Sequence, residues 1–204
     1  MTEPISPGIR ADPAAATAAW RGWPYFSIAA ILALTVIALR LEGRIWFCDC
    51  GSIRIWITDV WSSHCSQHLF DPYSITHMSH GLIFAMALGL LAPRMRTAWQ
   101  FCIAVAIAAA WEVLENSPLI INRYRESTMS LDYLGDSIVN SLGDIAACAA
   151  GFFIARKIGW KWTLALFALT ELLLLWLIRD NLTLNVVMLI RPVEAIKLWQ
   201  SAGH

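Results

Sequence analysis

Long apolar stretches separated by short polar segments are the main pattern of this 204-residue chain. A helix needs roughly 20 mostly apolar residues to cross about 30 Å of hydrocarbon, and five stretches meet that requirement. The pattern therefore predicts an all-α, polytopic membrane helix bundle of about five transmembrane helices. The expected spans are residues 23–41, 75–92, 97–114, 134–155 and 160–178.

Two further segments flank these spans. Residues 1–22 hold three prolines and an alanine-rich run, which indicates a flexible N-terminal tail. After residue 178, Pro192 divides the remaining apolar residues into pieces too short to cross a bilayer. The expected organisation is therefore a tail (1–22), a five-span transmembrane domain (23–178) and a C-terminal interfacial helix within residues 179–204.

The amino-acid composition excludes a soluble globular domain and a nucleic-acid-binding protein. Hydrophobic residues make up 58% of the chain and charged residues only 15%, whereas soluble domains carry about 25% charge. Fifteen Lys and Arg balance fifteen Asp and Glu, so no net positive charge attracts a polyanion. The expected partner is the lipid bilayer, and nucleic acid is excluded.

Basic residues in the short connections favour one orientation. Arg94 and Arg96 lie between the second and third spans, and Arg156, Lys157 and Lys161 lie between the fourth and fifth. Short loops rich in Lys and Arg stay in the cytoplasm. We therefore expect a multi-pass protein of the bacterial inner membrane with a cytoplasmic N-terminus.

Ionisable residues gather where three of the expected spans begin or end, although each costs about 2.5–3.5 kcal/mol at membrane depth. Residues three or four apart share one helix face. The second span begins, the third ends and the fourth begins on the same side of the membrane, so three polar stripes should converge there. The stripes are His77 and His80, Glu112 and Glu115, and Asp132, Asp136, Asn140 and Asp144.

Carboxylates in a low-dielectric space each need a metal, an arginine or a proton. In a first reading, a divalent metal ion activates water or anchors a phosphate. Its ligands are expected among His77, His80, Glu112, Glu115, Asp136 and Asp144. In this reading Glu112, Asp136 and His80 are the candidate catalytic residues.

In a second reading, Arg123 and Arg125 neutralise the acids of a recognition pocket or a packing network. The same arginines suit a phosphate by forked hydrogen bonding, so they are candidate substrate-binding residues together with Asn140. Taken alone, Asn140 is better explained as a contact between helices. A packing role for the whole set is disfavoured because packing requires only one or two hydrogen-bonded pairs. Of the two histidines, His80 is expected to lie deeper and His77 nearer the rim.

The connection between the first two spans holds Cys48, Cys50 and Cys65. A disulfide from Cys65 to Cys48 or Cys50 is the preferred expectation, followed by free thiols. The remaining alternative is a metal knuckle built from Cys48, Cys50, His64 and Cys65 with His68 nearby. C-x-C followed by H-C is not a standard zinc pattern, so this alternative ranks last. His64 and His68 are four residues apart in a loop without a helical pattern, and they are therefore expected on the surface.

Two other polar features, Glu171 and residues 179–181, each allow two interpretations. Glu171 is either a proton carrier or the hydrogen-bonding partner of a neighbouring helix. Residues 179–181 (Arg-Asp-Asn) either extend the pocket or cap a helix. Cys102 and Cys148 are expected to be packing residues.

Four motifs carry a resemblance over nearly the whole chain: THMSHG at 76–81, WEVLENS at 111–117, NRYR at 122–125 and RDNLTLN at 179–185. In these the sequence resembles an uncharacterised bacterial family of multi-pass inner-membrane proteins. The resemblance implies an integral cell-membrane location and no assigned activity.

A sparser resemblance links spans two to four to VanZ-like membrane proteins. It rests on His80, on Glu112 or Glu115, on Arg125 and on DSIVNSLG at 136–143. The likeness implies a setting of envelope lipids and glycopeptide sensitivity. The second histidine, the second glutamate and the additional carboxylate of the present chain depart from that pattern and favour a metal.

These observations lead to three functional hypotheses. The first is an outward-facing polar pocket that binds or hydrolyses an envelope lipid or a lipid-linked phosphate. The second is a proton-coupled small transporter, which is disfavoured because carriers hold their substrate near the midplane of the bilayer. The third is a non-catalytic membrane scaffold or assembly factor.

Overall fold

The computed structural model describes residues 13–127 and 133–202, and within them the chain forms eight helices and no β-strand. This confirms the expected all-α class. The helices are α1 (Pro13–Leu41), α2 (Pro72–Leu91), α3 (Thr97–Glu115), α4 (Pro118–Ser127), α5 (Ile138–Ile158), α6 (Trp160–Ile178), α7 (Leu182–Ile190) and α8 (Glu194–Ser201).

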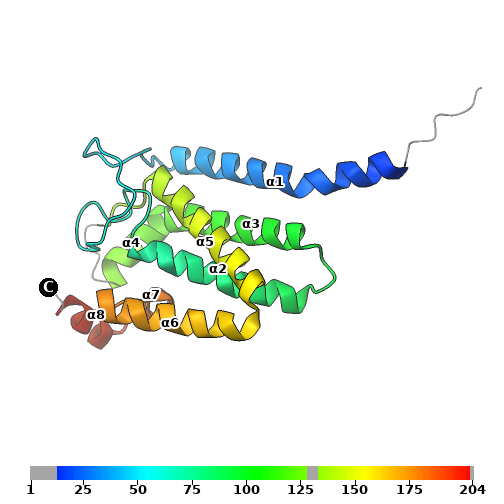
Figure 1. The fold of residues 1–204 in the computed structure, drawn as a ribbon. Coiled ribbons are helices and arrows are strands. Elements are labelled where there is room, and N and C mark those ends of the chain that lie inside the picture. The colour runs from blue at the N-terminus through cyan, green and yellow to red at the C-terminus, as the bar shows by residue number, and fades with distance from the viewer. Residues whose placement is uncertain (1–12, 128–132, 203–204) are drawn as a thin grey trace, which may run out of the picture.

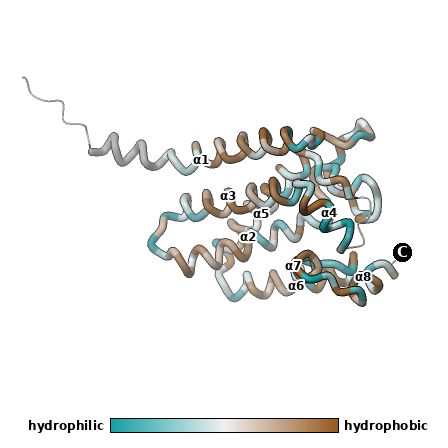
Figure 2. The backbone as a smooth tube through the Cα atoms, turned by 180° about the vertical axis from the view of Figure 1, so that it is seen from behind, coloured by the Kyte–Doolittle hydropathy of each residue, from teal (hydrophilic) through white to brown (hydrophobic). Residues whose placement is uncertain are grey.

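Five of these helices are long and apolar enough to cross a membrane, namely α2, α3, α5, α6 and the Gly22–Leu41 part of α1. They run alongside one another, with α1 and α6 at opposite edges and the other three between them (Figure 1). The loop of residues 42–71 gathers at one end of the bundle with α4, α7 and α8. Apolar residues follow the long helices, whereas hydrophilic segments lie mainly at their ends (Figure 2).

Helices α2 and α5 form the most extensive packing pair of the bundle. Two glycines allow their backbones to meet: a Cβ on Gly81 would collide with the Cys148 carbonyl oxygen, and one on Gly151 would collide with the Met78 carbonyl oxygen. Beside this contact, Leu82 and Phe152 are completely buried in an apolar cluster. The close approach brings the polar residues at the starts of α2 and α5 together.

The fourth long helix begins at Ile138, later than the sequence pattern predicts. Residues 133–137 are not helical, and Gly135 has a φ of +89°, a value that favours glycine. Asp136 therefore precedes the helix, and only Asn140 and Asp144 of the expected four-residue stripe lie on α5. The stripe expectation was wrong on this point because Ser137 caps the helix by accepting the N–H of Asn140. Asp132 lies outside the described residues.

The loop of residues 42–71 packs against the start of α5 and accepts hydrogen bonds from it. The backbone N–H of Ile138 donates to the Ile45 carbonyl (2.8 Å), and that of Ser137 donates to the Ser66 carbonyl (2.9 Å). The side-chain amide of Asn140 donates to the His68 carbonyl (2.9 Å). Because the first N–H groups of a helix have no partner within it, this loop supplies acceptors that α5 itself lacks.

The two ends of the chain extend the pattern read from the sequence. Helix α1 begins at Pro13, ten residues before the expected first span. After residue 178 the chain forms two short helices, α7 and α8, instead of one. Their location in the membrane interface stays a prediction.

Candidate functional site

A cavity of about 810 Å³ lies at the end of the bundle where the 42–71 loop, α4 and α7 meet the long helices. Polar residues from α2, α3, α5 and the segment before α5 contribute to its wall, together with residues of the loop. The ionisable and sulfur-containing residues among them include His77, His80, Glu115, Asp136, Asp144, Cys48, Cys50 and His64.

His77, Glu112 and Asp144 form a first group that could hold a metal ion. Nδ1 of His77 lies 3.2 Å from Oε1 of Glu112, and its Nε2 lies 3.9 Å from Oδ2 of Asp144. One ligand atom from each residue lies within 4.8 Å of the others, and all three residues are buried. The three come from α2, α3 and α5, so the predicted convergence of these helices does bring these groups together.

Glu112, Glu115 and Asp136 form a second group of three residues whose ligand atoms also lie within 4.8 Å of one another. Glu112 belongs to both groups. Glu112 is 0% exposed, and neither of its carboxylate oxygens has a hydrogen-bond partner among the described residues. Oε2 of Glu115 and Oδ1 of Asp144 are also buried without such a partner in the described chain. Buried carboxylates in this state require a proton or a cation.

Asp136 is held by neighbours that sequence reasoning did not assign. The Tyr133 hydroxyl donates to its Oδ1 (2.8 Å), and the Asn116 side-chain amide donates to its Oδ2 (3.1 Å). In return, the Asp136 backbone N–H donates to Oδ1 of Asn116 (2.7 Å). Burial raises the pKa of Asp136 to about 6 despite these hydrogen bonds, which by themselves lower it. In the sequence, Asn116 could have been recognised as a site residue only because it directly follows Glu115.

The two histidines of α2 have the opposite depths to those expected. His77 is 6% exposed and faces Glu112 and Asp144, whereas His80 is only half-buried. The His80 ring contacts that of His77 edge-on (centroids 5.5 Å apart) and stacks on Phe84 (5.9 Å). His80 belongs to neither of the two groups that could hold a metal ion, but it lines the cavity. The expectation was wrong because His77 points at α3 and α5, which cover it.

Arg123 and Arg125 are used elsewhere in the fold. Arg123 donates to the carbonyl oxygens of Leu189 (2.9 Å) and Ile190 (3.1 Å), and Arg125 donates to that of Tyr133 (2.6 Å). Neither arginine is among the described residues that line the cavity. These contacts tie α4 to α7 and to the segment before α5, which weakens the reading in which the two arginines neutralise the acids.

Among the described arginines, Arg44 does line the cavity, and sequence reasoning missed it as a site residue. Its Nη1 donates to the Leu134 carbonyl, and its buried Nε has no hydrogen-bond partner in the described chain. The sequence shows only an arginine just beyond the first span. Arg44 and Leu134 are 90 residues apart in the sequence, so no local pattern reveals their contact.

Asn140, the third candidate for substrate binding, is 1% exposed. Its amide donates to the His68 carbonyl, so the residue joins α5 to the 42–71 loop. Asn140 is thus a packing contact, as the simpler reading held, but its partner is the loop and not a second helix.

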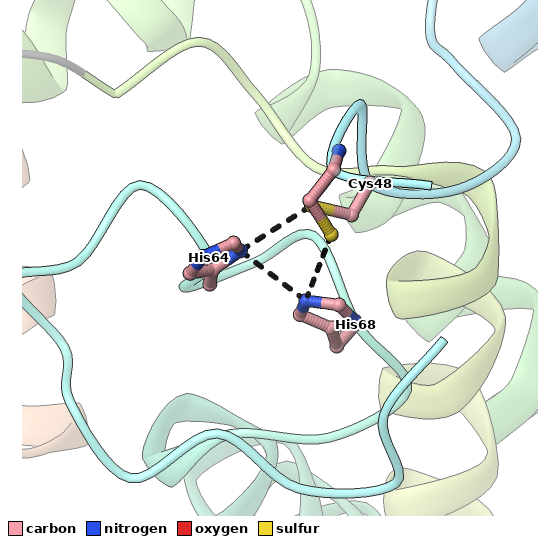
Figure 3. A group of neighbouring side chains, drawn as sticks. Cys48, His64 and His68 are labelled. Carbon is pink, nitrogen blue, oxygen red and sulfur yellow. Dashed lines mark hydrogen bonds between the residues drawn. The ribbon is translucent and has the colours of Figure 1, made fainter. Parts of the chain in front are cut away.

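The cysteines are all free, and the expected disulfide from Cys65 was wrong. Sγ of Cys65 contacts Oδ2 of Asp71 (3.7 Å), away from the other two loop cysteines. Cys48, Cys50, His64 and His68 instead form a third metal-sized group, with ligand atoms within 4.8 Å of one another. Cys48, His64 and His68 point toward one another in Figure 3.

His68 is 1% exposed, so the expectation of a surface residue was wrong for it. The residue is buried because its backbone carbonyl lies against Asn140 and its ring lies against Cys50 and His64. Within this group, hydrogen bonds from the Cys48 and Ser52 side chains lower the pKa of the exposed Cys50 thiol.

Glu171 has a structural role at the start of α7. Its carboxylate accepts the backbone N–H groups of Leu182 (3.0 Å) and Thr183 (3.0 Å) and the Thr183 hydroxyl (2.5 Å). Of the two readings of this residue, these bonds favour that of a hydrogen-bonding partner for a neighbouring helix.

Residues 179–181 fulfil both of their alternative readings. The Asn181 side chain caps α7 by accepting the N–H of Leu184, while Asp180 is buried and lines the cavity. The Tyr73 hydroxyl donates to Asp180 (3.4 Å). Burial raises the pKa of Asp180 to about 6.

Comparison with known proteins finds a family but no activity. The family model described as "Protein of unknown function (DUF2585)" matches residues 39–202. A UPF0314 protein of Sphingopyxis alaskensis is 48% identical over 183 residues, which cover 89% of this chain and 96% of that protein. A UPF0314 protein of Paracoccus denitrificans is 44% identical over 182 residues, covering 89% and 94% respectively. No solved structure matches the chain. The expected resemblance to an uncharacterised bacterial family is thus confirmed.

Proposed function

We infer the function of this chain, which belongs to the DUF2585 family of proteins of unknown function, from the chemistry of its cavity. Our proposal is a bacterial inner-membrane protein that binds a divalent metal ion at its buried carboxylates. With that ion it hydrolyses a phosphate ester in the head group of an envelope lipid.

The observation that carries this proposal is the position of Glu112. It belongs to both carboxylate groups, is completely buried, and has two oxygens without a hydrogen-bond partner among the described residues. Carboxylate oxygens with one imidazole nitrogen suit cations such as Mn²⁺, Mg²⁺ or Zn²⁺. A divalent cation would neutralise charges that the described arginines do not reach.

The substrate class follows from the rest of the wall. Apolar side chains such as Ile107, Val186 and Leu189 line the cavity beside the acids, which suits a molecule with both an apolar and an anionic part. A metal ion held by the carboxylate groups would meet the anionic part together with Arg44, which lines the cavity. A phosphate attached to a lipid has this combination of properties.

The residues suggest a simple hydrolytic step. Water attacks the phosphorus atom of a lipid phosphate monoester, and the bond from phosphorus to the lipid oxygen breaks. The proton of the water passes to the His80 imidazole, which lines the cavity without being in a metal-sized group, and then to the leaving oxygen. The products are the lipid alcohol and inorganic phosphate. Glu112, which the cavity does not reach, would hold the metal and leave substrate contact to Asp136 and His80.

The experiment measures phosphate release by the detergent-purified chain loaded with Mn²⁺, Mg²⁺ or Zn²⁺. The substrate is phosphatidate in mixed micelles. We expect release with at least one of these ions and a loss of about 100-fold or more in His80→Gln, because a general base contributes typically 10²–10⁴-fold. The bound metal should be unchanged in this variant, since His80 is outside both groups. No release by the wild type, or an undiminished rate in His80→Gln, would contradict the proposed reaction.

The orientation proposed here places the cavity outside the cytoplasm. Arg94 and Arg96 lie between α2 and α3, and Arg156 and Lys157 close α5, so both basic clusters lie at the end of the bundle opposite the cavity. A reporter enzyme that is active only outside the cytoplasm should therefore be active when fused after residue 204. Activity of the same reporter only when it is fused before residue 1 would reverse the orientation.

A further inference from the structure

We propose that Cys48, Cys50 and His64 bind a thiophilic metal ion of the Zn²⁺ class, with His68 as an adjoining hydrogen-bond donor. This site lies in the 42–71 loop and shares no residue with the carboxylate groups of α2, α3 and α5. It extends the proposed function without depending on it.

The spacing of the side chains is the first argument. Around a tetrahedral zinc ion, Zn–S and Zn–N bonds of the usual lengths place neighbouring ligand atoms about 3.3–3.8 Å apart. Here Sγ of Cys48 lies 3.4 Å from Nδ1 of His64, within that range. One ligand atom of Cys50 lies within 4.8 Å of both, so a small inward movement of this exposed side chain completes the three-ligand set.

Hydrogen bonding decides which nitrogens are ligands. Nδ1 of His68 accepts the backbone N–H of Arg54 (3.1 Å), so the neutral His68 ring carries its proton on Nε2. That N–H lies 3.4 Å from Nδ1 of His64 and 3.9 Å from Sγ of Cys50, so Nδ1 of His64 is unprotonated and accepts it in the metal-free site. A bound metal ion would take this lone pair, and the N–H would turn to the Cys50 sulfur. His64 is a ligand in this arrangement, whereas His68 presents a donor to the site and stabilises thiolate charge.

The backbone provides a hydrogen bond to the Cys48 sulfur. The N–H of Cys50 donates to its Sγ (3.4 Å), a bond that strengthens when the sulfur carries a negative charge. Two thiolates and one imidazole form a soft ligand set, in contrast to the oxygen-rich groups deeper in the bundle. The two kinds of site should therefore select different ions.

Location gives the site a role in the cavity. Cys48, Cys50 and His64 all line it, so a bound ion would be accessible from the cavity. The same loop supplies acceptors to the start of α5, including the His68 carbonyl that Asn140 reaches. An ion held by three side chains of this loop would fix the wall that the loop forms.

The test uses Co²⁺ as a spectroscopic probe of the full-length, detergent-purified and reduced chain. The wild type should show a thiolate-to-cobalt charge-transfer band that saturates at one Co²⁺ per chain, in addition to any Co²⁺ at the carboxylate groups, and Zn²⁺ should abolish the band. Cys50→Ser should lower the affinity for Co²⁺ roughly tenfold or more and weaken the band, because a ligand is lost. Cys50 is exposed, so this change should not disturb folding.

Two controls separate this site from its neighbours. Cys65→Ser alters a cysteine of the same loop outside the group and should leave the band and the affinity unchanged. Glu112→Gln should also leave the band intact, whatever the outcome for phosphate release. Absence of a charge-transfer band in the reduced wild type would overturn the proposal, as would an equal effect of Cys50→Ser and Cys65→Ser.

Discussion

Gly151→Ala should destabilise the protein by more than about 2 kcal/mol, although it adds a single methyl group. The new Cβ would collide with the Met78 carbonyl oxygen across the α2–α5 contact, and a backbone atom cannot rotate away as a side chain can. Separating the two helices by even a small distance would also open the contact around Leu82 and Phe152. Thermal or denaturant unfolding in detergent measures the loss.

Gly89→Ala is the matched control for this prediction. Gly89 lies in α2, and a Cβ there would meet only the flexible end of Arg156 at an ordinary contact distance of 3.5 Å. Because alanine favours a helix over glycine by up to about 1 kcal/mol, this variant should be as stable as the wild type or slightly more so. Equal stability of the two alanine variants would show that α2 and α5 are not in close backbone contact.

Glu112→Gln should remove the divalent metal from the carboxylate groups and lower phosphate release by about 100-fold or more. The amide has the size of the carboxylate but no charge, and Glu112 is the one residue that both groups share. Metal analysis of the purified protein and the phosphatidate assay measure the two losses.

The same variant should be about as stable as the wild type when both lack metal. Glu112 is completely buried and would then carry a proton, so glutamine replaces one neutral group by another of the same size. The exposed Glu126 provides the control, since Glu126→Gln should change neither metal content nor stability. A Glu112→Gln protein that keeps its full metal content would exclude the carboxylate groups as the metal site.

The architecture was predictable because membrane crossing depends on length and hydropathy, which a sequence displays directly. The convergence of His77, Glu112 and Asp144 followed from the alternating direction of successive spans together with spacings of three and four residues. Both arguments are local in sequence and need no side-chain packing. The family resemblance was likewise visible in short motifs.

The errors concern features that depend on contacts between distant segments. Asp136 was assigned to a helix that begins only at Ile138, because the 42–71 loop, far away in the chain, supplies the acceptors at that start. The same loop buries His68 and keeps Cys65 apart from Cys48. Its conformation has no periodic pattern from which these positions could be read.

Glu112 belongs to both carboxylate groups, and this affects how many metal ions the protein can bind. Glu112 is shared by the two groups, so it would contribute to holding both of two cations present together, whereas each of the other four residues would hold one. The first ion would neutralise part of the charge that attracts the second. Binding would then proceed in two unequal steps.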